Sequence, residues 1–304
     1  MKENTFIICS IRTDLVEKCI ETIYKYNKPD SFYIYFIDNT KDGIYDKVKG
    51  KIHLYFRANR NLGFSKSNNT AIRCVQTPYF TLINDDVELI NSKWWQGILD
   101  TFDMVDKATP HKPCALATPS SIKLPDWSVG KPKGEHHYMI PYKENYTEED
   151  WDSLISKPHY VNKHFTIQPG SVVDGVTMYC SVLKAEHFRR VGYLDERFNY
   201  GGGEDYDWSC RANMAGFRVV GTSLSYLYHH WSKSLESIKD YKELIDEDRV
   251  WNNNNEKWGD NFDIWGRRCS ICKEHMKIIK GTDYATCSKS HEKYKIPNIT
   301  IEDF

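Results

Sequence analysis

Apolar runs alternate with amphipathic stretches along the first part of the chain. The apolar runs predict buried strands at residues 5–11, 32–40, 51–61 and 79–86. Stretches with helical spacing predict helices at 13–27 and 67–76, and the pair Thr13-Asp14 is a good N-cap for the first. Strands that alternate with helices indicate an α/β fold, in which a mostly parallel sheet has helices on both faces.

A second set of elements follows after residue 168. Residues 175–181 and 217–230 have strand-like composition, and a helix is predicted from Glu204 to a stop at Gly216. Residues 123–168 lie between the two sets and are rich in Pro, Lys, Tyr and Trp. They lack a clean period until a capping box and short helix at 147–156, so we interpret them as an insertion.

Polar side chains stand at the ends of three predicted strands. They are Asp38, Asn61 and the pair Asp85-Asp86 in "LINDDVEL". Ligands of parallel sheets gather beyond the carboxyl ends of the strands, where these side chains are expected to lie. Adjacent carboxylates repel unless a cation relieves them, and Mg2+ or Mn2+ prefers carboxylate and phosphate oxygens. The pattern favours a metal-bridged diphosphate, and a solvated turn is the alternative.

Five motifs in a fixed order resemble the family-two glycosyltransferases of GT-A fold over residues 5–235. They are "IDNT", "NRNLGFSKSNNTAI", "LINDDVEL", "GEDYDWSCRANMAGFRVV" and "YHHWSKS". The resemblance implies that Asp38 holds the nucleotide base and that Gly63 lets the backbone approach the nucleotide, beside Asn61 and Asn68. It also implies that Asp85 and Asp86 bind the ribose and the metal, with Asp86 the better metal ligand.

The segment "YGGGEDYDW" offers a general base. Sugar transfer needs the acceptor hydroxyl deprotonated as it attacks, and a carboxylate in a partly desolvated site can do this. By the resemblance Asp205 is the base, and Glu204 is expected to orient the acceptor or the loop. The alternative is that the two carboxylates only cap the helix.

Two histidines are the last residues of the predicted strand 217–230. Histidine can complete a metal site already held by a carboxylate and diphosphate, so His229 or His230 is a candidate ligand. A packed or surface histidine is the alternative for each. Ser232, Lys233 and Ser234 are candidates for a lid over the phosphates.

Composition and charge limit the setting of these sites. The chain has 304 residues, with 41 basic and 42 acidic side chains and a net charge of -1, so no global attraction to nucleic acid or lipid is expected. Apolar runs are too short for a transmembrane segment. A soluble protein is therefore expected. Six of nine cysteines lie singly in apolar segments, which predicts a reducing, cytoplasmic compartment: Cys9, Cys19, Cys74, Cys114, Cys180 and Cys210.

The tail carries a zinc-knuckle-like spacing. Cys269 and Cys272 are separated by two residues, and Cys287 and His291 by three, with fourteen residues between the pairs. Four such ligands suit a structural Zn2+, although His275 competes and three unrelated thiols are the alternative. Many lysines and arginines surround the motif, which makes a basic surface module plausible.

Taken together, the sequence predicts an inverting, metal-dependent glycosyltransferase that moves a hexosyl or pentosyl group from a nucleotide-diphospho-sugar to a hydroxyl. Residues 1–235 are the predicted transferase domain, and 236–304 a helical segment with the Cys/His tail. The expected acceptor is a glycan or lipid-linked saccharide, to which aromatics of the insertion such as Trp127, Tyr138 and Trp151 can stack. The alternatives are a hydroxylated base in DNA as acceptor, or a non-catalytic nucleotide-sugar or nucleic-acid binding protein.

Overall fold

The structure, a computed structural model, describes most of the predicted transferase domain and parts of the tail. The described residues are 2–12, 14–58, 60–121, 147–149, 171–172, 176–198, 201–230, 257, 277–278, 284–286, 289–290 and 293–295. Most of the insertion at 123–168 lies outside these residues.

Within the described residues one nine-stranded sheet forms the centre of the fold. Its strand order is β3-β2-β1-β4-β8-β6-β9-β5, and β7 pairs with β9. The bounds are β1 (Asn4–Ser10), β2 (Phe32–Asp38), β3 (Leu54–Arg57), β4 (Tyr79–Asn84), β5 (Val87–Leu89), β6 (Cys114–Ser121), β7 (Ser171–Val172), β8 (Cys180–Lys184) and β9 (Arg218–His229). Strands β1 to β4 are parallel, and so are β6 and β9, whereas β8 runs antiparallel to both β4 and β6.

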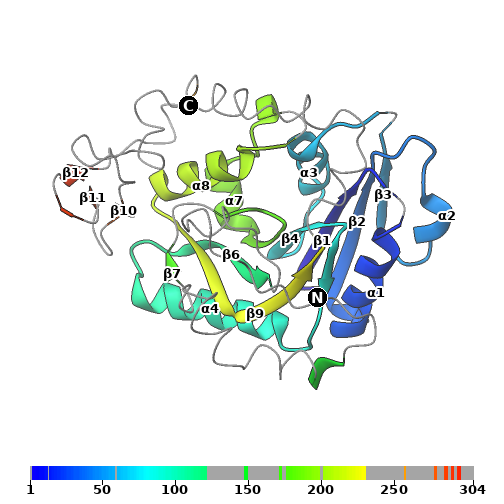
Figure 1. The fold of residues 1–304 in the computed structure, drawn as a ribbon, viewed down its shortest axis with the longest axis horizontal. Helices are drawn as coiled ribbons and strands as arrows, with labels where there is room; N and C mark the ends of the chain where they lie inside the picture. The colour runs from blue at the N-terminus through cyan, green and yellow to red at the C-terminus, as the bar shows by residue number, and fades with distance from the viewer. Residues whose placement is uncertain are drawn as a thin grey trace.

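Helices cover both faces of this sheet (Figure 1). The bounds are α1 (Val16–Tyr26), α2 (Tyr45–Val48), α3 (Phe64–Ile72), α4 (Trp94–Ala108), α7 (Ala185–Val191) and α8 (Glu204–Met214). Apolar residues of α1 and α4 form one core cluster with the sheet, and those of α3, α7 and α8 form the other. The predicted α/β architecture, a curled and largely parallel sheet between helices, is therefore confirmed.

Close backbone approach explains how α4, an element absent from the predictions, sits on the sheet. A Cβ added to Gly97 of α4 would lie 2.0 Å from the carbonyl oxygen of Leu224 in β9. Only glycine permits that separation, so the helix lies directly against the strand that ends in His229.

Several predicted boundaries are wrong, each for a local reason. Helix α1 has Leu15 rather than Thr13-Asp14 at its N-cap, because the Asp14 carboxylate pairs with the guanidinium of Arg12. Helix α3 starts at Phe64, three residues before the predicted 67, because Gly63 with φ 76° turns the chain into it. The predicted strand at 175–181 begins only at Cys180, since residues 178–179 form a turn.

The tail contributes a small antiparallel sheet, drawn at the left edge of Figure 1. Its strands are β10 (Lys277–Ile278), β11 (Tyr284–Thr286) and β12 (Lys293–Lys295), paired in that order. The proposed zinc ligands Cys269, Cys272, Cys287 and His291 lie outside the described residues, as does the competing His275.

Candidate active site

The carboxyl ends of β1, β2 and β4 lie side by side. Ser10 pairs with Asp38 at the ends of β1 and β2, and Cys9 pairs with Asn84 at the end of β4. Parallel strands therefore bring the polar end of each apolar run to one edge of the sheet. This edge, which we call the carboxyl edge, holds Ser10, Asp38 and Asn84, and the turn Asp85-Asp86 follows directly.

Asp38 is completely buried, and its carboxylate is occupied by its own loop. One oxygen accepts hydrogen bonds from the backbone and hydroxyl of Thr40, at 2.8 and 2.6 Å. The other accepts the backbone N–H of Ile44 at 2.8 Å and the hydroxyl of Tyr55. Burial raises the pKa of Asp38, but these hydrogen bonds outweigh it and hold the pKa below its ordinary value. The side chain shapes the loop 38–44, and its predicted contact with a base stays a prediction.

The segment after β3 is shaped by asparagines. Asn61 accepts the N–H of Gly63 at 2.8 Å, and Asn39 accepts the N–H of Leu62 at 3.2 Å. Asn68 donates to the carbonyl of Phe64 at 3.0 Å and accepts from the thiol of Cys9. Asn61 thus forms the turn that presents Gly63 and the start of α3, whereas buried Asn68 ties α3 to β1.

Asp85 and Asp86 are both buried, with 2% and 3% of their surface exposed. The hydroxyl of Ser10 donates to the carboxylate of Asp85. Arg12 lies close enough that Asp85 and Asp86 add to the effect of Asp14 in raising the pKa of its guanidinium. The turn therefore has a nearby permanent cation, yet two buried carboxylates remain beside each other.

The two histidines at the end of β9 have different partners. His229 Nε2 lies 3.0 Å from Oδ1 of Asp86, and its ring stacks on Tyr179 with a centroid separation of 4.9 Å. His230 Nε2 instead lies 2.7 Å from Oε1 of Glu88. Burial raises the pKa of Asp86, but the hydrogen bond and charge of His229 bring it below the ordinary value. Of the two candidates, His229 is the one whose ring contacts the Asp86 carboxylate, whereas His230 reaches Asp86 only through its backbone N–H, which donates to the Asp86 carbonyl at 2.8 Å.

The Asp86–His229 pair fits a divalent metal. Two adjacent ligands of an octahedral ion with bonds of roughly 2.1 Å are about 3.0 Å apart, which is the separation of Oδ1 and Nε2. Among the described residues, no group of three or more His, Cys, Asp or Glu side chains could hold a metal ion. A metal here would therefore need further ligands, and diphosphate oxygens are suitable ones.

Glu204 and Asp205 begin α8, but neither is its N-cap. That position is Gly203, with φ 96°, and no side chain makes a cap hydrogen bond there. The Asp205 carboxylate does accept the N–H of Tyr206 at 2.8 Å within the first turn. Burial, together with the charge of Asp205, raises the pKa of Glu204 to about 8. Burial likewise raises the pKa of Asp205 to about 6, against backbone hydrogen bonds from Tyr206 and Met178 that lower it. Asp205 is half-buried, and it is the more acidic member of the pair.

The turn at 178–179 connects the two halves of the site. The backbone of Met178 hydrogen-bonds to Asp205, and the ring of Tyr179 stacks on His229. The carbonyl of Tyr179 also accepts the N–H of Asn84 at 2.8 Å. One turn therefore contacts the candidate base, the candidate metal ligand and the end of β4.

Sequence reasoning missed several residues of this site. Ser10 and Tyr55 bind the predicted carboxylates, Glu88 binds His230, and Tyr179 supports His229. Only Ser10 had a usable signal, because it ends an apolar run as Asp38 does. The lid candidates Ser232, Lys233 and Ser234 lie outside the described residues. None of the helices among the described residues has the length and apolar character to span a bilayer.

Known proteins resemble this chain in both sequence and fold. Residues 5–153 match the model of glycosyl transferase family 2. The O-antigen biosynthesis protein RfbC of Myxococcus xanthus is 26% identical over 184 residues, which are 60% of this chain and 13% of that protein. The uncharacterized protein y4gI of Sinorhizobium fredii is 25% identical over 184 residues, 58% of this chain and 18% of that protein. The chain thus spans less than a fifth of the length of these curated relatives.

A solved structure supports the fold assignment. GalNAc-T7, crystallised with UDP, GalNAc and Mn2+, superposes with a TM-score of 0.56 at 12% identity, over 86% of this chain and 50% of that one. At this identity the similarity concerns the fold. Together with the family match and the motif order, it leads to one conclusion: the chain carries a family 2 glycosyltransferase domain of GT-A fold.

Proposed function

We propose that this chain transfers a sugar from a nucleotide-diphospho-sugar to a hydroxyl acceptor, with inversion at the anomeric carbon. The observation that carries the proposal is the turn at 178–179, which contacts both Asp205 and His229. It contacts the candidate base, Asp205, and one member of the pair Asp86–His229, which is the candidate site for the metal and diphosphate. An inverting transfer needs the base on one side of the anomeric carbon and the leaving diphosphate on the other.

Asp205 is the proposed general base. With a pKa of about 6 it is mostly ionised at neutral pH, yet basic enough to accept a proton from a hydroxyl as that hydroxyl attacks. In the single displacement, the acceptor oxygen forms a bond to the anomeric carbon while the bond to the diphosphate oxygen breaks. The proton goes to Asp205, and the nucleoside diphosphate leaves with the bonding electrons.

Asp86 and His229 are the proposed ligands of a Mn2+ or Mg2+ ion, with Asp85 beside them. Such an ion, when bound, neutralises the charge that develops on the leaving diphosphate. Asp86 is suited to this role because its pKa is lowered, so it stays ionised. Gly63 and the start of α3 are proposed to approach the nucleotide through their backbone, and Asp38 to act on it through its loop 38–44.

The acceptor is proposed to be a glycan or lipid-linked saccharide. The relative RfbC is named for O-antigen biosynthesis, which is saccharide chemistry. The overall net charge of -1 gives no general attraction toward DNA, so the nucleic-acid acceptor receives no comparable support.

Donor hydrolysis tests this function directly, because water can replace an unidentified acceptor. We expect the protein to release nucleoside diphosphate from at least one of UDP-GalNAc, UDP-GlcNAc, UDP-glucose and GDP-mannose with Mn2+ present, and not with EDTA. The variant Asp205→Asn serves as the control for contaminating hydrolases and should lose the activity. No release from any donor, or release unchanged in Asp205→Asn, contradicts the proposal.

A further inference from the structure

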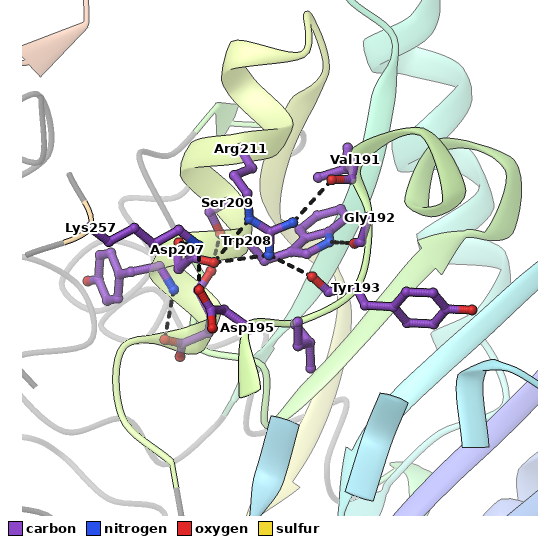
Figure 2. Close-up of polar contacts among 12 residues, drawn as sticks. Val191, Gly192, Tyr193, Asp195, Asp207, Trp208, Ser209, Arg211 and Lys257 are labelled. Atoms are coloured by element: carbon purple, nitrogen blue, oxygen red, sulfur yellow. Dashed lines mark hydrogen bonds and ion pairs between the residues drawn. The ribbon is translucent and has the colours of Figure 1, made fainter. Parts of the chain in front are cut away.

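A largely buried lysine from far along the chain bridges two aspartates, one of which belongs to α8 (Figure 2). Nζ of Lys257 lies 2.7 Å from Oδ2 of Asp195 and 2.6 Å from Oδ1 of Asp207. The Lys257 side chain is 10% exposed, and that of Asp207 is not exposed at all. Lys257 belongs to neither the matched residues 5–153 nor the predicted domain 1–235.

Asp207 belongs to the first turn of α8, the turn that carries Glu204 and Asp205. Its N–H donates to the carbonyl of Gly203 at 2.8 Å, which closes that turn. Its side chain is held by Lys257 on one oxygen and by Nε of Arg211, at 3.0 Å, on the other. Both oxygens of the Asp207 carboxylate are therefore held by cations, two residues along the same helical turn from Asp205.

The backbone of the segment Val191–Asp195 is hydrogen-bonded to side chains of α8 and α3. Arg211 donates to the carbonyls of Val191 and Tyr193 at 3.1 and 2.8 Å, as Figure 2 shows. Trp208 Nε1 donates to the carbonyl of Gly192 at 2.9 Å.

Asn69 of α3 makes the remaining side-chain hydrogen bonds to the backbone of this segment. It donates to the carbonyl of Leu194 at 2.8 Å and accepts the N–H of Leu194 at 3.1 Å. Helix α3 directly follows the predicted nucleotide-binding loop at Asn61 and Gly63. The segment Val191–Asp195 therefore connects that loop, through α3, to α8, the helix that carries Asp205. Lys257 joins the last residue of this segment, Asp195, to the same turn of α8.

We propose that Lys257 is a positioning residue for the transfer reaction, and that it holds the first turn of α8 so that Asp205 faces the acceptor. This inference rests on the proposed function of Asp205. It also assigns a catalytic consequence to the segment around residue 257, which lies in the predicted appendage 236–304.

The physical reason is the charge balance of a buried site. Without the ammonium group, oxygens of Asp195 and Asp207 would face each other at on the order of 5 Å, largely away from water. Removing one member of a buried ion pair leaves its partners uncompensated, so the side chains move apart or take up protons. Arg211 and Arg197 still neutralise part of this charge, so the fold persists while the turn shifts.

Lys257→Met tests the proposal, because methionine keeps the length of the side chain and removes the charge. The control is Lys184→Met, which removes a lysine that is 18% exposed and pairs with Asp106 at the opposite end of the sheet. The measurements are kcat and donor KM for UDP-GalNAc, or for whichever panel donor is hydrolysed fastest, and the thermal midpoint.

We expect Lys257→Met to lower kcat by roughly 10- to 100-fold, since small displacements of a reacting group have effects of this size. Donor KM should change by less than about two-fold, and Lys184→Met should leave kcat unchanged at a similar loss of thermal midpoint. Adding Asp195→Asn to Lys257→Met should recover part of kcat, because it removes one of the two facing charges. If Lys257→Met does not fold, Lys257→Gln, which also removes the charge, replaces it in the same measurements with the same expected loss of kcat.

A kcat for Lys257→Met within two-fold of wild type would overturn the proposal, and so would an equal loss in Lys184→Met. Hydrogen exchange distinguishes failure of the positioning role of Lys257 from failure of the proposed transferase function. If wild type hydrolyses no donor, faster exchange in the peptide 201–211 of Lys257→Met, with 94–108 unchanged, still supports the positioning role. Unchanged exchange in 201–211 refutes it.

Discussion

Oδ1 of Asp86 lies 3.0 Å from Nε2 of His229, although 143 residues separate them in the chain. The antiparallel pairing of β5 with β9 produces this contact, because Val87 stands opposite His229. The next residue, His230, is directed to Glu88 instead. The two adjacent histidines therefore have different side-chain partners. Substituting each in turn gives a test variant and a matched control.

His229→Gln is expected to abolish the Mn2+ dependence of nucleotide binding, because it removes the imidazole nitrogen beside Asp86. His230→Gln should retain it, since the His230 imidazole contacts Glu88, and the contact of His230 with Asp86 is made by its backbone N–H, which the substitution keeps. Titration calorimetry with UDP or GDP, in Mn2+ and in EDTA, measures both. We expect the affinity of His229→Gln to fall by at least about ten-fold in Mn2+, toward that of wild type in EDTA.

An equal loss of nucleotide affinity in Mn2+ in the two histidine variants would indicate that the end of β9 only supports the fold. Retention of the Mn2+ effect in His229→Gln, with loss in His230→Gln, would assign the ligand to the other histidine.

Asp38→Asn is expected to destabilise the protein by about 1–3 kcal/mol, because an amide nitrogen cannot accept the hydrogen bonds that Asp38 now receives. The pKa of Asp38 is lower in the folded protein than its ordinary value, so the ionised carboxylate stabilises the folded state. This stabilisation is fully present above the ordinary carboxyl pKa and is lost as pH falls through the lower folded pKa. Urea unfolding at pH 7 measures the loss. The exposed carboxylate of Asp46 supplies the control, since Asp46→Asn should leave stability unchanged. An equal stability for both variants would be inconsistent with an organising role for Asp38.

The sheet was largely predictable because its strands are long apolar runs. Segments such as 5–11 and 79–86 cannot be left in water, and their alternation with amphipathic stretches favours a parallel core. The antiparallel course of β8 was not predictable, because strand direction depends on partners chosen by the whole fold. Likewise, α3 begins at Phe64 because of the backbone at Gly63, which apolar spacing does not reveal.

The candidate site was predictable where a polar group ends an apolar run or belongs to an ordered motif. Asp86 and Asp205 were found in this way, and the structure brings both to the turn at 178–179 through His229 and Met178. Partners set by long-range contacts had no local signal. Lys257 is one lysine among many in the sequence, and only folding places it between Asp195 and Asp207.

Asp205→Asn is expected to lower kcat by roughly 10^2- to 10^4-fold while leaving donor KM nearly unchanged, as loss of a general base does. The wild-type rate should rise with pH through about 6, because the base must be ionised to accept a proton. In Asp205→Asn this rise should disappear. Steady-state donor hydrolysis between pH 5 and pH 8 measures both effects. A variant with activity within a few-fold of wild type would move the assignment to Glu204.

Glu204→Gln is expected to stabilise the protein at alkaline pH and to have little effect on stability at acid pH. The folded pKa of Glu204, about 8, lies above its ordinary value of 4.5. A carboxyl group with a raised folded pKa favours the folded state below its unfolded pKa, and this contribution is lost as pH rises through the folded pKa. Glutamine stays neutral, so it avoids the buried charge that wild type acquires near pH 8.

Thermal unfolding at pH 5, 7 and 9 measures this difference. The stability of Glu204→Gln relative to wild type should grow from near zero at pH 5 to as much as a few kcal/mol at pH 9, since each pKa unit corresponds to about 1.4 kcal/mol. Glu186→Gln, at an exposed position on α7, should show no such trend. A constant offset between Glu204→Gln and wild type across this range would mean that Glu204 is ionised in the folded protein at all three pH values. It would then stand beside Asp205 as a second charge, and the pKa of the base would have to be set by that repulsion rather than by burial.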